Sequence, residues 1–267
     1  MTRYVRFEEN GGARVRSPER AEPRERWGRV SEDGESVTPL AGAPWTTEAA
    51  AGPAIPRSPL ALLPPAEPTK ILCIGRNYKA HAAELGNELP KEPMVFLKAP
   101  SSLVPHGGTV VLPKDAGRID FEGELALVIG KRCRSVPREG DAWKDVVFGL
   151  TLAIDVTARE LQKRDGQWWR AKGTDTFCPL GPALVHGVEP GDLLLETTLD
   201  GEKKQSARTS AMIFDVPTIV SWITAAMTLE PGDVILTGTP EGVGPLSAGQ
   251  RLELTVERVG TLSVQIA

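Results

Sequence analysis

Two glutamates stand two residues apart in an otherwise apolar stretch, IDFEGELALVIGK, at residues 119–131. The alternation predicts a buried β-strand, in which side chains at i and i+2 share a face, so Glu122 and Glu124 would lie about 7 Å apart. Two buried like charges repel each other and raise their pKa values, whereas a divalent cation between them turns the repulsion into binding. Carboxylate oxygens favour Mg²⁺, Mn²⁺ or Ca²⁺ over zinc. We therefore expect a site for a hard divalent cation.

A third carboxylate, Asp155, ends the apolar run GLTLAI and precedes VTARELQ. A lone acid among aliphatic residues needs a partner, and a cation shared with Glu122 and Glu124 would be one. A second interpretation needs no metal: the two glutamates line a solvated strand face, and Asp155 caps a helix that begins near Thr157. Spacing alone leaves both interpretations open.

Three further polar residues could do chemistry. In RNYKAHAAELG a short helix is expected, with Asn77 as its N-cap and Gly86 just past its end. This helix places His81 and Glu84 at i and i+3, which suits a carboxylate that orients an imidazole, although exposed polar pairs share that spacing. Lys172, in the loop WWRAKGTDTF, is either a catalytic cation or a surface lysine.

The Gly-rich segment LTGTPEGVGPL has no GK[ST] and is therefore not a phosphate-binding P-loop. Its backbone amides and the hydroxyl of Thr239 suit a carboxylate ligand.

Composition limits the class of protein. The chain has 267 residues, 40% hydrophobic and 25% charged, which is enough for a large core. The net charge is −4 and the basic residues are scattered, so we expect no nucleic-acid partner. Cys73, Cys133 and Cys178 form no CxxC pair, and no stretch suits a signal peptide or a membrane span. A soluble cytoplasmic protein is expected.

The elements that must position these residues are mainly strands. Strand patterns separated by Gly, Pro and Asp turns dominate, and the only other helical signals are ARELQKR and VPTIVSWITAAM. The absence of regular βαβ alternation predicts a β-dominated α+β fold. Residues 1–68 are expected to form a small N-terminal β module with a Pro-rich linker at 53–68, and residues 69–267 the catalytic domain.

Six ordered stretches resemble the fumarylacetoacetate hydrolase family: CIGRNYKAHAAELG, FLKAPSSL, DFEGELALVIGK, DVTARELQ, RAKGTDTFCPLGP and MTLEPGDVILTGTPEGVGP. The resemblance covers about residues 70–260 and implies a mixed β-sandwich roll, usually a homodimer.

The resemblance also implies roles for individual residues. It implies that Mg²⁺ or Mn²⁺, with Ca²⁺ as a substitute, is held by Glu122, Glu124 and Asp155. The other implied roles are a water-activating pair, His81 with Glu84; a catalytic cation, Lys172; and substrate contacts from Lys98, Arg159, Gln162 and Thr239.

Four residues depart from the family pattern. Gly173-Thr174 follow the motif lysine where Ser-Phe is usual, and Gly123 replaces a bulkier residue. Ile74 stands seven residues before the histidine, where fumarylacetoacetase itself has an aspartate. The shorter, acylpyruvase-like branch is therefore the better comparison.

The family's substrates are small 2-oxo acids, and the presence of His81 with Glu84 favours hydrolysis of a C–C bond in a 2,4-diketo acid such as an acylpyruvate. A 2-hydroxyhepta-2,4-diene-1,7-dioate isomerase or an oxaloacetate decarboxylase is the alternative, because both would use the same ligands. A third hypothesis is a non-catalytic binding module stabilised by Ca²⁺, which would leave Lys98 and Lys172 unexplained.

Overall fold

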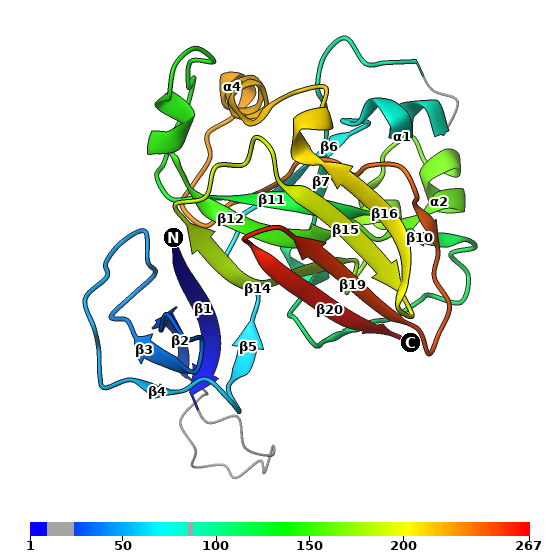
Figure 1. The fold of residues 1–267 in the computed structure, drawn as a ribbon. Coiled ribbons are helices and arrows are strands. Elements are labelled where there is room, and N and C mark those ends of the chain that lie inside the picture. The colour runs from blue at the N-terminus through cyan, green and yellow to red at the C-terminus, as the bar shows by residue number, and fades with distance from the viewer. Residues whose placement is uncertain (10–23, 85–87) are drawn as a thin grey trace.

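The computed structural model describes residues 1–9, 24–84 and 88–267, and its dominant feature is a large mixed sheet (Figure 1). Its path runs β4 (Ile55–Pro56), β3 (Ser36–Pro39), β2 (Arg24–Val30), β1 (Thr2–Glu9), β14 (Cys178–His186), β12 (Val147–Ile154), β11 (Gly123–Ile129), β17 (Val234–Leu236), β6 (Ile71–Gly75) and β7 (Met94–Lys98). Off this path, β5 (Ala61–Leu63) pairs with β1 and β8 (Leu103–Val104) pairs with β14.

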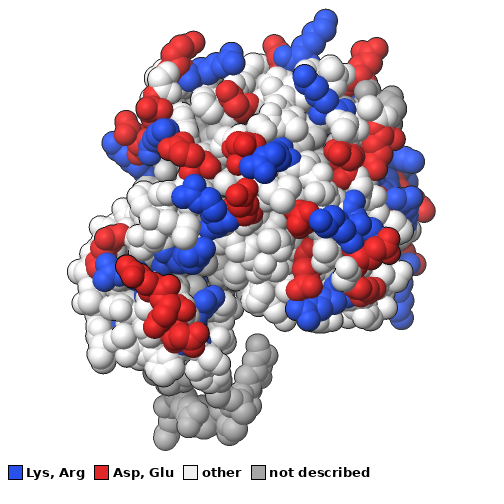
Figure 2. All heavy atoms as spheres, in the orientation of Figure 1, with Lys and Arg blue, Asp and Glu red and all other residues white. Residues whose placement is uncertain are grey.

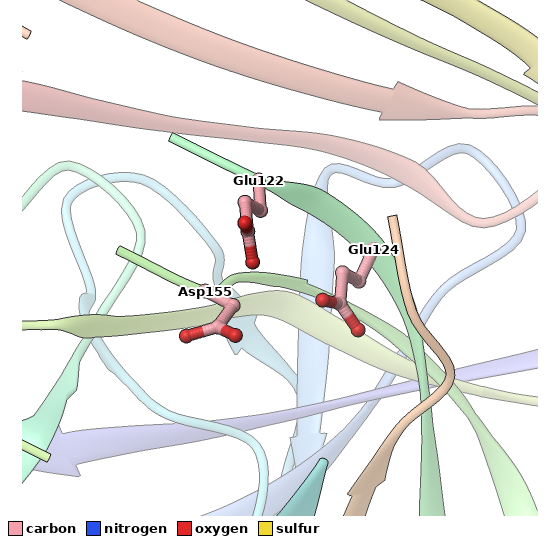
Figure 3. Close-up of side chains that lie close together, drawn as sticks. All are labelled: Glu122, Glu124 and Asp155. Atoms are coloured by element: carbon pink, nitrogen blue, oxygen red, sulfur yellow. The ribbon is translucent and has the colours of Figure 1, made fainter. Parts of the chain in front are cut away.

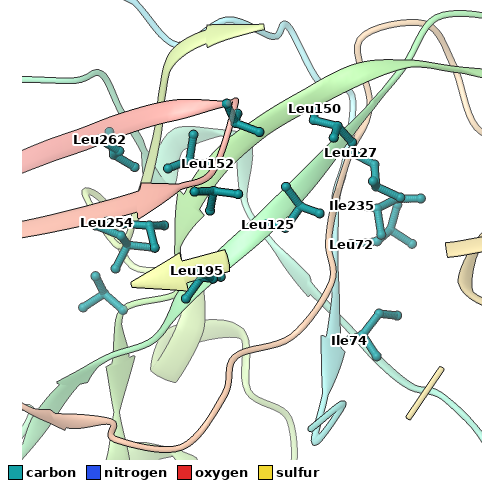
Figure 4. Close-up of a cluster of buried hydrophobic side chains, with 14 of the residues drawn as sticks. Leu72, Ile74, Leu125, Leu127, Leu150, Leu152, Leu195, Ile235, Leu254 and Leu262 are labelled. Atoms are coloured by element: carbon teal, nitrogen blue, oxygen red, sulfur yellow. The ribbon is translucent and has the colours of Figure 1, made fainter. Parts of the chain in front are cut away.

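A second sheet covers one face of the first. Its order is β16 (Glu202–Arg208), β15 (Leu194–Leu199), β19 (Arg251–Val256), β20 (Gly260–Ile266) and β9 (Thr109–Val110). Leucines from β11, β12, β15, β19 and β20 fill the space between the layers (Figure 4). Every residue of β11 is buried, whereas β15 buries alternate residues, so β11 is a central strand and β15 has one open face.

The expected continuous strand at 119–131 is broken at Glu122. Residues before the break form β10 (Ile119–Phe121), which lies in a three-stranded sheet with β13 (Thr157–Ala158) and β18 (Gly244–Pro245). Residues after it form β11 in the large sheet. The backbone N–H of Gly123 donates to the side chain of Gln205, 3.0 Å away, and not to a neighbouring strand. The chain therefore changes sheets at Glu122, and Gly123 is the first residue of β11.

The three expected helices are confirmed as α1 (Lys79–Glu84), α2 (Arg159–Arg164) and α4 (Val216–Ala226), while Gly86 lies outside the described residues. In α4 the Asp215 carboxylate accepts from the N–H of Thr218 and caps the helix. Lys172 ends a short helix, α3 (Trp169–Lys172), where a loop was expected. The 3₁₀ turns are η1 (Pro100–Ser102), η2 (Ala142–Asp145) and η3 (Thr209–Ala211).

The N-terminal strands extend the large sheet, because β1 pairs antiparallel with β14. The Pro-rich segment, expected to be an extended linker, contributes β4 and β5 to this sheet. β4, which contains Pro56, pairs with β3 alone, as a proline within a strand requires, and β5 pairs with β1 alone. We keep the division into 1–68 and 69–267 as a proposal.

The surface carries both signs of charge. Figure 2 shows lysines and arginines interspersed with aspartates and glutamates over the face in view. Within the described ranges, no helix has the length and apolarity needed to span a membrane.

Candidate metal and substrate site

Three carboxylates converge where the two sheets and the broken strand meet (Figure 3). Glu122 occupies the break, Glu124 lies on β11, and Asp155 follows β12. One oxygen of each lies within 4.8 Å of the others. The residues are 5%, 2% and 0% exposed, respectively, so the glutamates do not line a solvated face. Asp155 is no helix cap either, since α2 begins at Arg159 without a side-chain cap.

Two buried lysines neutralise part of this charge. The ammonium group of Lys172 donates to Glu122 (2.7 Å), to Asp155 (2.5 Å) and to the hydroxyl of Thr157 (2.7 Å). That of Lys98 donates to the other oxygen of Asp155, at 2.5 Å. Both lysines are 2% exposed. Burial favours the neutral amine, but the charges of Asp155 and Glu122 outweigh it and raise the pKa of Lys172.

A third cation, Arg159, closes one side of the cluster. Its Nη2 lies 2.7 Å from Glu122 Oε1, and its Nε donates to Asp120 Oδ2 at 2.8 Å. Nη1 donates to Gln162 Oε1 at 3.1 Å. Arg159 and Gln162, both expected near a substrate, therefore contact each other, and Arg159 is held by two acids. Sequence reasoning missed Asp120, although the period-two series of acids in DFEGE could have revealed it.

The two glutamates titrate in opposite directions. Burial alone would raise the pKa of Glu122, but the charges of Lys172 and Arg159 outweigh it and hold this pKa below its ordinary value. Burial, followed by repulsion from Asp155 and Glu122, raises the pKa of Glu124 well above its ordinary value. Glu124 accepts a hydrogen bond from Gly238 N (2.6 Å), but no lysine or arginine in the described chain forms an ion pair with it.

This donor set fits a divalent cation. It offers three buried carboxylates and no thiolate or imidazole within the cluster, a set that favours Mg²⁺ or Mn²⁺ over zinc. Glu124 gives the clearest support, because it is a buried carboxylate with one backbone donor, and a bound cation would offset its charge.

The expected His81–Glu84 pair lies beside this cluster. His81 is 4% exposed, and its Nδ1 lies 3.3 Å from Glu84 Oε2. A positive charge on its imidazole, after the charges of Lys172 and Arg159, is among the causes that lower the pKa of Glu122. Glu84 is exposed and also accepts from the N–H of Gly242 at 3.1 Å. The Gly-rich segment that contains Gly242 is thus hydrogen-bonded to the His81–Glu84 pair.

Thr239 is engaged with the protein. Its hydroxyl donates to the carbonyl of Gly123 at 2.9 Å and accepts from the side-chain amide of Gln205 at 2.8 Å. The hydroxyl expected to contact a substrate therefore joins the loop to the strand break.

Two neighbours of His81 in the sequence were misassigned or missed. Asn77, expected as a helix cap, donates instead to the carbonyls of Phe214 (3.0 Å) and Thr237 (2.7 Å). Tyr78 is 1% exposed, and its hydroxyl finds no hydrogen-bond partner among the described residues. Burial, then the charges of Glu124 and Glu241, raise its pKa above the ordinary value. No periodicity marks either residue, and the partners of Asn77 are distant in sequence.

Steric crowding accounts for two departures from the family pattern, Gly123 and Gly173. A Cβ at Gly123 would lie 2.3 Å from Thr197 Oγ1 and 2.9 Å from a methyl of Leu254. At Gly173 it would lie 2.6 Å from the carbonyl of Trp169. Real Cβ atoms do not approach so closely, so a larger residue would need the side chains of Thr197 and Leu254 to shift at position 123, and the backbone to shift at position 173.

Comparison with known proteins agrees with this geometry and defines the class. The family described as fumarylacetoacetate (FAA) hydrolase C-terminal matches residues 70–267, and the one described as Rv2993c-like, N-terminal matches residues 2–65. The chain therefore belongs to the fumarylacetoacetate hydrolase family, as the resemblance predicted. The relatives that are named for an activity are isomerases, oxaloacetate tautomerases and hydrolases.

The chain is 50% identical over 190 residues to oxaloacetate tautomerase FAHD1, mitochondrial, of Arabidopsis thaliana, covering 69% of this chain and 84% of the relative. The structure of 2-hydroxyhepta-2,4-diene-1,7-dioate isomerase from Mycobacterium marinum superimposes with a TM-score of 0.88 at 39% identity, covering 100% and 98% of the two chains. The structure of fumarylpyruvate hydrolase from Pseudomonas aeruginosa, in complex with Mn²⁺ and pyruvate, superimposes with a TM-score of 0.71 at 32% sequence identity. The match covers 76% of this chain and 91% of that one. The β-dominated fold with an N-terminal region is confirmed.

Proposed function

We propose that this protein is a divalent-metal-dependent isomerase or keto–enol tautomerase that acts on a small 2-oxo dicarboxylic acid of the oxaloacetate type. The observation that carries the proposal is the convergence of Glu122, Glu124 and Asp155 within 4.8 Å, with Lys172 bonded to two of them. The named tautomerase and isomerase relatives support it.

Glu122, Glu124 and Asp155 would hold Mg²⁺ or Mn²⁺. When bound there, the ion would supply a Lewis acid that polarises the 2-oxo group and offsets the charge of the adjacent carboxylate.

The chain's own residues account for the proton transfer. Lys172 places its ammonium group among the carboxylate oxygens, where it would stabilise negative charge that develops on the 2-oxo oxygen. Glu84 engages Nδ1 of His81 and leaves Nε2 to accept the proton from the carbon beside the carbonyl. Return of that proton to oxygen gives the enol, and its return to a different carbon gives a shifted double bond.

Hydrolysis of a C–C bond in an acylpyruvate or fumarylpyruvate, which the sequence favoured, is the second candidate. The His81–Glu84 pair supports it, because the same imidazole could deprotonate water instead of carbon. The fumarylpyruvate hydrolase relative also supports it.

An ultraviolet assay of the purified protein, stripped with a chelator and then supplied with Mg²⁺ or Mn²⁺, separates the candidates. We expect faster keto–enol exchange of oxaloacetate, or isomerisation of a dienedioate, with metal only. Faster depletion of acetylpyruvate or fumarylpyruvate would favour hydrolysis, and release of pyruvate from oxaloacetate would favour decarboxylation. If the metal raises only the melting temperature, and no substrate is converted, the protein is a binding module and the proposal is wrong.

A further inference from the structure

One buried amide outside the carboxylate cluster contacts two of the segments that build it. Gln205 lies on β16, in the second sheet, and is 1% exposed. Its Oε1 accepts from the N–H of Gly123 at 3.0 Å. Its Nε2 donates to Thr239 Oγ1 at 2.8 Å and to the carbonyl of Pro240 at 2.9 Å.

An amide side chain matches these three partners. Gln205 occupies the one position of β16 that is buried, where an apolar residue would normally stand. A buried amide costs free energy unless its polar atoms are hydrogen-bonded, and here one acceptor meets a donor and two donors meet acceptors. Methionine has a similar shape but would leave Gly123 N and the carbonyl of Pro240 without this partner.

The two segments joined by Gln205 both lead to the same carboxylate. Gly123 separates Glu122 from Glu124 at the point where the chain changes sheets. Thr239 follows Gly238, whose N–H donates to Glu124 at 2.6 Å. Gln205 therefore spans the strand and the loop that together orient Glu124.

The loop is also packed tightly against β16 further along. A Cβ at Gly242 would lie 2.0 Å from the carbonyl of Lys204, so only glycine allows this approach. The N–H of the same glycine donates to Glu84, the partner of His81. Contacts with β16 thus continue from the carboxylate cluster to the histidine pair.

We infer that Gln205 is a positioning residue of the proposed active site, which fixes the spacing between the strand break at Gly123 and the loop residue Thr239 so that Glu124 is held ready for the cation. This inference rests on the proposed function. Outer residues that orient metal ligands typically change metal affinity by about 10- to 100-fold when they are replaced.

The test is a calorimetric titration of Mn²⁺ into metal-free protein, without substrate. Gln205→Met is expected to raise the dissociation constant for Mn²⁺ by about 10-fold or more and to lower kcat for the substrate that the wild type converts. Gln250→Met is the matched control. Gln250 likewise accepts from a backbone N–H (Ser247, 2.7 Å) and donates to a side chain (Asp200, 3.0 Å), but in an exposed turn. Its Mn²⁺ affinity should equal that of the wild type.

A second variant keeps the inference testable if Gln205→Met folds poorly. Thr239→Val removes the hydroxyl that contacts both Gln205 and the carbonyl of Gly123, but it leaves the hydrogen bonds from Gln205 to Gly123 and Pro240, so it should also weaken Mn²⁺ binding, by less than Gln205→Met. The double variant should lose less free energy of Mn²⁺ binding than the sum of the losses in the two single variants, because both substitutions break the same hydrogen-bonded connection.

The outcomes separate positioning from a merely structural role. A lower melting temperature with unchanged Mn²⁺ affinity in both variants would overturn the inference. Additive losses would also overturn it. If the wild type itself binds neither Mn²⁺ nor Mg²⁺, the proposed function fails first, and that result is visible before any variant is made.

Discussion

Two regions of this molecule bury carboxylates, and they treat them differently. Asp233, where β17 begins, is 0% exposed, and its Oδ1 accepts from the N–H (2.9 Å) and hydroxyl (2.8 Å) of Thr69 and from the N–H of Lys70 (3.1 Å). Its Oδ2 accepts from Glu230 N (2.8 Å) and from the ammonium of Lys70. Backbone donors surround this acid, so its charge is satisfied within the fold.

At the strand break the acids face one another. Glu122 and Asp155 share the ammonium of Lys172, and Glu124 has one backbone donor and two like-charged neighbours. The difference teaches that burial alone does not identify a functional acid. An acid whose donors come from the backbone joins segments together, whereas acids that repel one another retain affinity for an added cation.

The largest expected effect tests the cluster's side of this comparison. Glu124→Gln keeps the shape of the side chain but removes its charge, so turnover should fall by about 1000-fold or more, since metal-ion catalysis supplies several kcal/mol. The metal-free variant should be at least as stable as the wild type, because the repulsion with Asp155 and Glu122 is gone. Kinetics with added Mg²⁺ and calorimetric unfolding with a chelator check both results. A destabilised metal-free variant would show that Glu124, like Asp233, is an acid whose charge stabilises the fold.

Removal of the Lys172 ammonium group from the cluster should give the next largest effect. Lys172→Met should lower kcat by about 100-fold, the effect typical of removing one group that stabilises developing charge. Its affinity for Mn²⁺ should be unchanged or higher, because the ammonium no longer competes for Glu122 and Asp155. Steady-state kinetics and a Mn²⁺ titration measure the two effects. Equal losses of kcat and of metal affinity would mean that Lys172 only supports the ligands.

The other side of the comparison is tested by Asp233→Ala. The variant leaves three partly buried backbone donors and the Lys70 ammonium without this carboxylate, so the free energy of unfolding should fall by about 3 kcal/mol. At a temperature where the variant is folded, kcat and Mn²⁺ affinity should match the wild type. Urea unfolding and kinetics on one preparation decide between the outcomes. A large loss of metal affinity would erase the distinction between the two regions.

The sequence predicted the acids of the cluster better than their surroundings. The i, i+2 spacing of Glu122 and Glu124 and the lone acid Asp155 are local signals, and the structure brings these residues together. The break at Glu122 could not be predicted. The N–H of Gly123 next to it is hydrogen-bonded to Gln205, which lies 82 positions further along the chain. Long-range hydrogen bonds of this kind leave no periodicity in the sequence.

The same limit applies to the fold. The helix at residues 216–226 was predicted because its apolar spacing is a local feature. The pairing of β1 with β14 joins segments about 180 residues apart, and the proline signal at 53–68 indicated only an extended chain. The sequence therefore indicated the elements but not which strands become neighbours.

The smallest expected effect concerns His106, which, like Asp233, accepts a hydrogen bond from a backbone N–H. The Nδ1 of His106 accepts from the N–H of Ser263 at 3.1 Å, which requires an unprotonated nitrogen. Burial, followed by the charges of Arg57 and Arg251, lowers the pKa of His106. The unfolded chain therefore binds this proton at a higher pH than the folded chain does.

The resulting stability is present at high pH and is lost as pH falls through the ordinary histidine pKa of about 6.5 towards the lower folded value. His106→Gln can still accept from Ser263 N and cannot titrate, so its unfolding free energy should fall less than that of the wild type between about pH 7.5 and 5.5. Urea unfolding across this range measures the difference, and Mn²⁺ affinity at pH 7.5 should be the same in both proteins. Equal pH dependence in the two proteins would mean that His106 carries no proton-linked stability, and a change in metal affinity would connect it to the carboxylate cluster instead.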